Sequence, residues 1–219
     1  MLRYKCLVLD HDDTVVQSEA TVNYPFFVEF LNEYRPGMTI SQHEYISGCF
    51  EPGYIPMCRQ RFGFTDEELL IEYNGWKDYI RSHIPAAYNG IGLLIHRYKE
   101  AGGILCVISQ SAQENILRDY RTHFSLEPDA VYGWDLEPEN RKPSTWALNQ
   151  IMQTYNLSPA DILVVDDMKA AVGMARNAGC PIAFAGWGRK EFPAICEEMH
   201  KLCDFSFYST EEFAEFLFG

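Results

Sequence analysis

The sequence is poor in positive charge. Its 219 residues include 18 Lys and Arg against 31 Asp and Glu, which gives a formal net charge of −13 at pH 7. Nucleic-acid-binding surfaces hold phosphate backbones with clustered Lys and Arg, so this balance argues against DNA or RNA as a partner. An acidic protein also repels anionic substrates at long range, and a phosphate site would therefore need positive charge close by.

Long apolar segments and paired cysteines are also missing. Residues 1–9 contain a short apolar run that meets an acidic cluster, which is too short and too acidic for a signal peptide or a membrane span. The seven cysteines are odd in number and have no CxxC spacing, so neither a disulfide framework nor a zinc site is indicated. We therefore expect a cytoplasmic protein with reduced thiols and no membrane partner.

What the sequence does contain is an alternation of apolar runs and helix signals. Short runs rich in Val, Ile and Leu occupy residues 6–9, 104–108, 130–132, 162–165 and 181–185. Between them lie Ser111 with Glu114 as a capping box, Ser158 before Pro159 as a helix start, and Gly179 as a helix stop. Alternating strands and helices predict an α/β fold with a doubly wound parallel sheet.

The alternation stops between residues 16 and 85. This stretch shows no strand pattern, but it does show helical apolar spacing behind a capping box of Thr65 and Glu68. We predict an α/β core domain of residues 1–15 and 86–219 and a helical insert of residues 16–85. Within the insert, residues 49–63 carry Arg59 and Arg61 and could form either a substrate-facing loop or a helix connection.

The first predicted strand runs directly into acidic residues. Asp10 and Asp12 follow it with a spacing of two, which places both side chains on one side if the strand geometry persists. Two carboxylates so close do not readily both ionise. One, held by a cation, would be an anionic nucleophile, and the other would serve as general acid and then base.

A second acidic pair, Asp166 and Asp167, ends the apolar run of residues 162–165. Parallel strands end at the same edge of a sheet, so both acidic sites would form an oxygen-rich pocket suited to Mg²⁺. Lys142, in a loop that enters a helix, would bring the site to neutrality. Ser109 ends another apolar run, and its hydroxyl could hold a phosphate oxygen.

Together these elements resemble the haloacid dehalogenase-like superfamily, specifically its phosphatase-type branch with a helical cap, which includes phosphoglycolate phosphatases and β-phosphoglucomutases. The resemblance spans nearly the whole chain. It lies in four segments: residues 10–15 (DHDDTV), 109–111 (SQS), 141–143 (RKP) and 165–167 (VDD).

The resemblance implies a Rossmann-like core, a helical cap and a magnesium-dependent phosphomonoester hydrolase that acts on a small phosphorylated metabolite. Asp10 would be phosphorylated during turnover, and Asp12 would be the acid and base. The remaining implied roles are phosphate or substrate contacts for Ser109, Gln110, Lys142 and Thr14, and metal contacts for Asp10, Asp12 through its carbonyl, Asp167 and Asp166. Cap residues would select the substrate, and Arg59 and Arg61 are candidate cations for a second anionic group on it. Thr14 would also orient the first loop through hydrogen bonds.

Three positions depart from the family pattern: His11 replaces an apolar residue, Asp13 a commoner Gly, and Ala171 a second Asp. We expect His11 to be structural, with pH tuning as its alternative role. A sugar phosphomutase and a catalytically silent binding protein stay open as other functions. Phosphonate cleavage would need a cap lysine such as Lys77. A monomer and a homodimer are equally compatible with the sequence.

Overall fold

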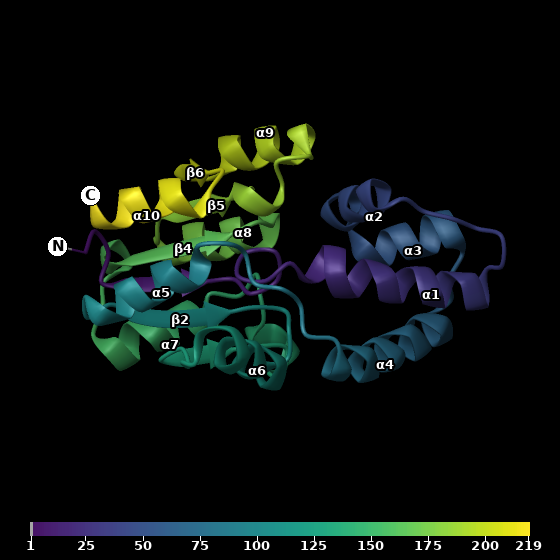
Figure 1. The fold of residues 1–219 in the computed structure, drawn as a ribbon, viewed down its shortest axis with the longest axis horizontal. Coiled ribbons are helices and arrows are strands. Elements are labelled where there is room, and N and C mark those ends of the chain that lie inside the picture. Colours follow the sequence, from purple (N-terminus) through teal and green to yellow (C-terminus); the bar gives the residue numbers. More distant parts are fainter. Residues whose placement is uncertain (1) are drawn as a thin grey trace. The chain divides into compact units, whose positions relative to one another are not determined.

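A computed structural model describes residues 2–219 (Figure 1). The chain divides into two compact units: Met1–Gln17 with Ala87–Gly219, called the core unit below, and Ser18–Ala86, called the cap unit. The boundaries expected from the sequence, after residues 15 and 85, lie within two residues of these.

The core unit is built on a single parallel sheet. Its strands are β1 (Cys6–Leu9), β2 (Ile104–Ile108), β3 (Ala130–Tyr132), β4 (Ile162–Asp166), β5 (Ile182–Ala185) and β6 (Phe205–Phe207). The spatial order is β3-β2-β1-β4-β5-β6 and every pair is parallel. The predicted doubly wound sheet is thereby confirmed, with β6 as a strand that the sequence did not reveal.

Helices follow the strands in turn (Figure 1). They are α5 (Ile91–Glu100), α6 (Gln113–Phe124), α7 (Trp146–Tyr155), α8 (Lys169–Ala178), α9 (Pro193–Leu202) and α10 (Thr210–Phe218), with 3-10 turns η3 (Pro138–Asn140), η4 (Pro159–Asp161) and η5 (Gly186–Gly188). One buried cluster joins Leu7 and Leu9 of β1 to Ile95 of α5, Tyr120 of α6 and Phe213 of α10. Because helices pack on both faces of the sheet, its central strands are apolar throughout rather than alternating.

Two of the three predicted helix signals are confirmed. Gly179 ends α8 in the left-handed conformation, with a φ of 74°, as predicted. Ser158 forms a capping box with Asp161 and precedes Pro159 at the start of η4, although η4 is a 3-10 helix of only three residues.

The prediction of a capping box formed by Ser111 and Glu114 was wrong. Helix α6 starts after Ala112, whose side chain makes no capping hydrogen bond. The Ser111 hydroxyl instead donates to Asp12, on the loop after β1. A local pattern was overridden here by a partner 99 residues away in the sequence.

The cap unit is helical. It contains π-helical turns η1 (Glu19–Asn23) and η2 (Cys49–Gly53) and helices α1 (Tyr24–Tyr34), α2 (Gln42–Gly48), α3 (Tyr54–Phe62) and α4 (Asp66–Ser82). Thr65 and Glu68 form the predicted capping box at the start of α4. Residues 49–63 are mainly helical, so neither the loop nor the simple connection expected there describes them. Phe27 packs against Tyr45 and Phe62 at centroid distances of 5.1 and 5.6 Å.

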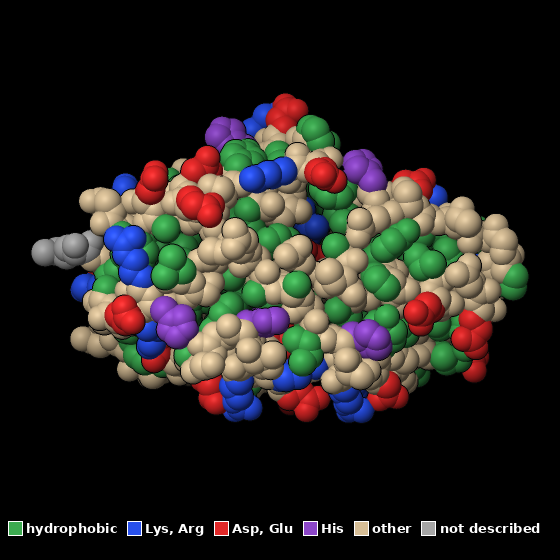
Figure 2. Space-filling view, in the orientation of Figure 1, with side chains coloured by type: hydrophobic (Ala, Val, Ile, Leu, Met, Phe, Trp, Pro, Cys, Tyr) green, Lys and Arg blue, Asp and Glu red, His purple; other side chains and the backbone are tan. Residues whose placement is uncertain are grey.

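The surface carries mixed charge. On the face shown in Figure 2, Lys and Arg side chains are interspersed with Asp and Glu and do not gather in one patch. Among residues 2–219, no helix is both long enough and apolar enough to cross a membrane.

Candidate active site

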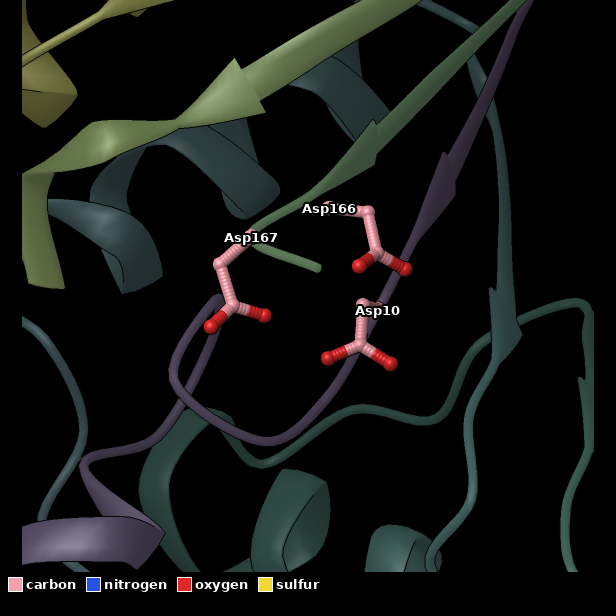
Figure 3. Close-up of side chains that lie close together, drawn as sticks. All are labelled: Asp10, Asp166 and Asp167. Atoms are coloured by element: carbon pink, nitrogen blue, oxygen red, sulfur yellow. The ribbon is translucent and has the colours of Figure 1, made fainter. Parts of the chain in front are cut away.

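Three carboxylates meet at the carboxyl ends of two neighbouring strands. Asp10 follows β1, Asp166 is the last residue of β4 and Asp167 comes next. Leu9 and Val165 are direct partners in the β1–β4 pairing. The strand order reverses around β1, which is where open α/β sheets bind their ligands. One oxygen from each carboxylate lies within 4.8 Å of the others (Figure 3).

Lys142 joins this cluster from the loop before α7. Its Nζ lies 2.6 Å from Asp10 Oδ1 and 2.5 Å from Asp166 Oδ2. The side chain is 5% exposed. Burial by itself would lower the pKa of Lys142, but the carboxylates of Asp10 and Asp166 outweigh it, and the pKa is raised. Lys142 is therefore a buried permanent cation that bridges the two strand ends.

The cluster still has an excess of negative charge. Burial raises the pKa of Asp10 well above its usual value, although Lys142 opposes the shift. Burial likewise raises the pKa of Asp167 to about 6, against the influence of Arg189. Burial thus disfavours the ionised forms of Asp10 and Asp167, and a further positive charge beside them would favour those forms.

The pattern of hydrogen bonds indicates where a cation would bind. Asp166 uses both oxygens, because Oδ2 accepts from Lys142 and Oδ1 accepts from the backbone N–H of Met168 at 2.8 Å. Among residues 2–219, no hydrogen bond falls on Asp10 Oδ2 or Asp167 Oδ1. Two hard oxygen donors on adjacent loops, within a cluster of buried carboxylates, fit a small divalent cation such as Mg²⁺.

Asp12 lies beside a pair of serines on the neighbouring strand end. Its Oδ2 accepts from the Ser111 hydroxyl at 2.5 Å and lies 3.4 Å from the Ser109 hydroxyl. Ser109 in turn accepts from the Ser111 backbone N–H at 3.1 Å. Ser111 was missed by the sequence reading, although its spacing of two from Ser109 could have revealed it. Gln110, between them, is exposed.

Thr14 fixes the loop after β1 through its backbone. Its side chain is fully buried, and its hydroxyl has no hydrogen-bond partner within residues 2–219. The orientation of this loop by hydrogen bonds of Thr14 therefore rests on the main chain, and substrate contact by Thr14 stays a prediction. The loop is tied down through the Thr14 carbonyl, which accepts from Trp187 Nε1 at 3.0 Å.

His11 anchors the same loop from its other side. It is 1% exposed, and its Nε2 lies 3.1 Å from Asp119 Oδ2 on α6. Arg118 donates to the second oxygen of Asp119 at 2.7 Å. This buried contact agrees with the structural role expected for His11.

A second buried cation, Arg189, was not anticipated from the sequence. It follows η5, donates through Nε to Asp167 Oδ2 at 2.9 Å, and lies 3.6 Å from Asp13 Oδ2. Arg189 and Asp13 add one positive and one negative charge, so the charge balance expected with Lys142 is unchanged. The residues around Arg189 in the sequence do not indicate that it belongs to the site. The additional acid at position 13 was the one sign that a further cation would be needed there.

The two cap arginines predicted to contact substrate form ion pairs within the cap unit. Arg59 Nη2 lies 2.5 Å from Asp66 Oδ1, and Arg61 Nη2 lies 2.9 Å from Glu44 Oε1. All four side chains are more than a third exposed. Substrate contact by Arg59 and Arg61 stays a prediction.

The site agrees with the family assignment. The model of the haloacid dehalogenase-like hydrolase family matches residues 7–185, so this chain belongs to that family. Phosphoglycolate phosphatases from two strains of Vibrio vulnificus, YJ016 and CMCP6, are each 42% identical over 50 residues. Each match spans 23% of this chain and 22% of the relative's length.

Solved structures share the whole fold at low identity. A protein from Lactobacillus plantarum, provisionally assigned as a phosphoglycolate phosphatase, has a TM-score of 0.78 at 20% identity over 98% of this chain and 99% of its own. A haloacid dehalogenase family hydrolase from Deinococcus radiodurans, solved with phosphate and sodium, has a TM-score of 0.75 at 17% identity over 100% and 99%. CbbY from Rhodobacter sphaeroides, solved as a mutant with xylulose-(1,5)bisphosphate, has a TM-score of 0.63 at 17% identity over 95% and 96%.

Proposed function

We propose that the protein is a magnesium-dependent phosphomonoester hydrolase in which the Asp10 carboxylate is transiently phosphorylated. The observation that carries the proposal is the buried cluster of Asp10, Asp166 and Asp167 with Lys142 at its centre. Proteins of similar fold that were solved with phosphate or a sugar bisphosphate support the substrate class. The small phosphorylated metabolite itself is left to experiment.

Asp10 and Asp167 would hold the metal ion, together with the Asp12 carbonyl. When bound, the ion would offset the negative charge of the phosphate oxygens and of the Asp10 carboxylate. Lys142 holds Asp10 Oδ1 at 2.6 Å, which fixes the orientation of the carboxylate and favours its ionised form. Asp166 keeps Lys142 in place and so supports the nucleophile indirectly.

The reaction has two steps. In the first, an Asp10 oxygen forms a bond to phosphorus, the ester P–O bond breaks, and the Asp12 carboxylic acid gives its proton to the departing oxygen. In the second, the Asp12 carboxylate takes a proton from water, the water oxygen bonds to phosphorus, and the Asp10–phosphorus bond breaks. Phosphate and an alcohol leave, and both aspartates return to their starting protonation states.

The position of Asp12 suits this exchange of a proton. Within residues 2–219, both hydrogen bonds to its carboxyl group fall on Oδ2, from Ser111 and Ser109. Oδ1 is then the oxygen that carries and accepts the proton. The serine pair would hold the acid in one orientation, and Ser109 would in addition contact the phosphate.

Phosphate release from a panel of phosphorylated metabolites and an aryl phosphate tests the proposal. We expect release with Mg²⁺, none with EDTA, and a rate at least about 1,000-fold lower in Asp10→Asn. Asp78→Asn, the same change at a cap carboxylate that is 77% exposed, is the matched control and should keep full activity.

The remaining functions predict different outcomes. A sugar phosphomutase would need a bisphosphate for activation and would release phosphate slowly. A silent binding protein would release none from any compound while still binding a metabolite. Rapid release from one monoester, dependent on Mg²⁺ and Asp10, would exclude both.

A further inference from the structure

The buried guanidinium of Arg189 links two acids that come from different loops. Arg189 is 4% exposed, and both its Nε and its Nη2 donate to Asp167 Oδ2, with the Nε bond at 2.9 Å. Nη2 also lies 3.6 Å from Asp13 Oδ2. A buried arginine is stable when paired in this way. Its charge thus lies next to a proposed metal ligand.

The turn before Arg189 is fastened to the loop that carries Asp13. Trp187 donates to the Thr14 carbonyl, and a Cβ atom on Gly188 would come within 2.3 Å of the Tyr88 hydroxyl and 3.0 Å of the Asp13 carbonyl. Only glycine fits there without displacing them. Tyr88 donates to Asp13 Oδ1 at 3.0 Å, so Arg189 and Tyr88 face different oxygens of this carboxylate.

In this arrangement the two oxygens of the Asp167 carboxylate have different roles. Arg189 occupies Oδ2, whereas Oδ1 accepts no hydrogen bond among residues 2–219. The free oxygen remains for the metal that the proposed function requires. The guanidinium, however, repels any cation bound there, and Asp13 partly offsets that repulsion.

We propose that Arg189 and Asp13 form an internal charge pair that sets the affinity of the site for divalent cations, Arg189 weakening it and Asp13 strengthening it. The proposal rests on the proposed function only in taking Asp10 and Asp167 as metal ligands. Removing Arg189 costs Asp167 a hydrogen-bond donor but also removes a positive charge beside a doubly charged ion. The charge effect is the larger of the two in a buried site.

Calorimetric titration of the EDTA-stripped protein with Mg²⁺, and separately with Mn²⁺, tests this pair. We expect Arg189→Gln to lower Kd at least about tenfold and Asp13→Asn to raise it at least about tenfold. The double variant Asp13→Asn/Arg189→Gln should return to within about threefold of the wild type. Arg189→Lys loses one of the two donors to Asp167 but keeps the charge, so an effect of charge predicts a Kd within about threefold of the wild type.

The direction in which Kd changes in the two single variants separates an effect of charge from a merely structural role. If Arg189 and Asp13 only hold the loops in place, both single variants bind metal more weakly, and that result overturns the proposal. An unchanged Kd in both single variants overturns it as well. Circular dichroism without metal checks that each variant is folded; should Arg189→Gln not fold, Asp13→Asn and Arg189→Lys carry the test with the values given.

The outcomes also separate this proposal from the proposed function. Suppose that the wild type binds metal and releases phosphate, but that both single variants change Kd in the same direction. This result contradicts the proposed charge pair and leaves the proposed function standing. Wild-type protein that binds neither Mg²⁺ nor Mn²⁺ contradicts the charge pair and the metal requirement together.

Discussion

The buried acids of the core unit and of the cap unit have different kinds of partner. In the core unit, Asp10 and Asp166 share Lys142, and Asp167 is paired with Arg189. In the cap unit, Glu72 is 7% exposed, and among residues 2–219 its hydrogen-bond partner is the neutral hydroxyl of Tyr54, at 2.7 Å.

This difference bears on whether a buried charge contributes to stability or to the positioning of reactive groups. Paired ions in a protein interior seldom add stability over apolar packing, but they fix the positions of the groups that react. The cations of the core unit lie beside the carboxylates that the proposed mechanism needs in ionised form. The cap unit leaves Glu72 without such a cation, and burial raises its pKa to about 6 although the Tyr54 hydrogen bond opposes the shift.

Removing the central cation of the core unit should have the largest effect. Lys142→Met leaves Asp10 and Asp166 buried without their ammonium partner, which we expect to cost about 3 kcal/mol of folding free energy and to lower the rate of phosphate release about 100-fold or more. Thermal unfolding and single-turnover kinetics measure the two effects. Lys201→Met, which breaks an ion pair more than two-thirds exposed, should change neither.

Replacing Glu72, the buried acid of the cap unit, by a neutral residue should stabilise the cap unit. The pKa of Glu72 rises from 4.5 to about 6 on folding, so the folded state binds more protons, and stability is lost as pH rises through about 6. Glu72→Gln should remove this loss, worth about 2 kcal/mol at pH 7.5 and little at pH 4.5. Hydrogen exchange of the cap amides at both pH values measures it. Equal protection of variant and wild type at pH 7.5 would contradict the assignment.

Losing the serine that holds Asp12 should slow turnover without unfolding the protein. Ser111→Ala removes the 2.5 Å hydrogen bond to Asp12, and we expect kcat to fall about tenfold. Ser158→Ala is a matched control, because among residues 2–219 that hydroxyl bonds only to Asp161, at the end of the three-residue η4. A fall in both variants alike would show that Ser111 acts through general stability.

Breaking an exposed ion pair of the cap unit should have the smallest effect on folding. Arg59→Met removes the partner of Asp66, which is 84% exposed, and should change the unfolding free energy by less than about 1 kcal/mol. The same variant tests the predicted substrate contact. A rise in KM without a change in stability would support that contact, whereas an unchanged KM for every substrate would exclude it.

The strands and the acidic cluster could be predicted because their signals are local. Val164 and its neighbours form an apolar run that ends in Asp166 and Asp167, and parallel pairing then requires this end to meet the end of β1. Strand β6 was missed because its three residues, Phe205–Phe207, include a polar serine that interrupts the apolar run. Strand β3 is equally short and also lies at an edge of the sheet, but its residues, Ala130–Tyr132, contain no such interruption.

The remaining parts of the site depend on contacts between distant residues. Ser111 forms a plausible capping box with Glu114 in sequence, yet in the fold its hydroxyl faces Asp12. Arg189 lies 22 residues from Asp167 and reaches it because Gly188 allows close packing. An isolated arginine in a sequence is usually a surface residue, so only the fold could assign it to the site.

Chemical trapping of the phosphorylated enzyme tests the central claim most directly. The protein would be mixed with its best substrate and Mg²⁺, quenched during turnover, reduced with borohydride and mapped by mass spectrometry. Borohydride converts an acyl phosphate to an alcohol, so we predict homoserine at position 10, dependent on substrate and absent in the presence of EDTA. Phosphate release that proceeds with an unmodified Asp10, or with the label on another residue, would contradict the account.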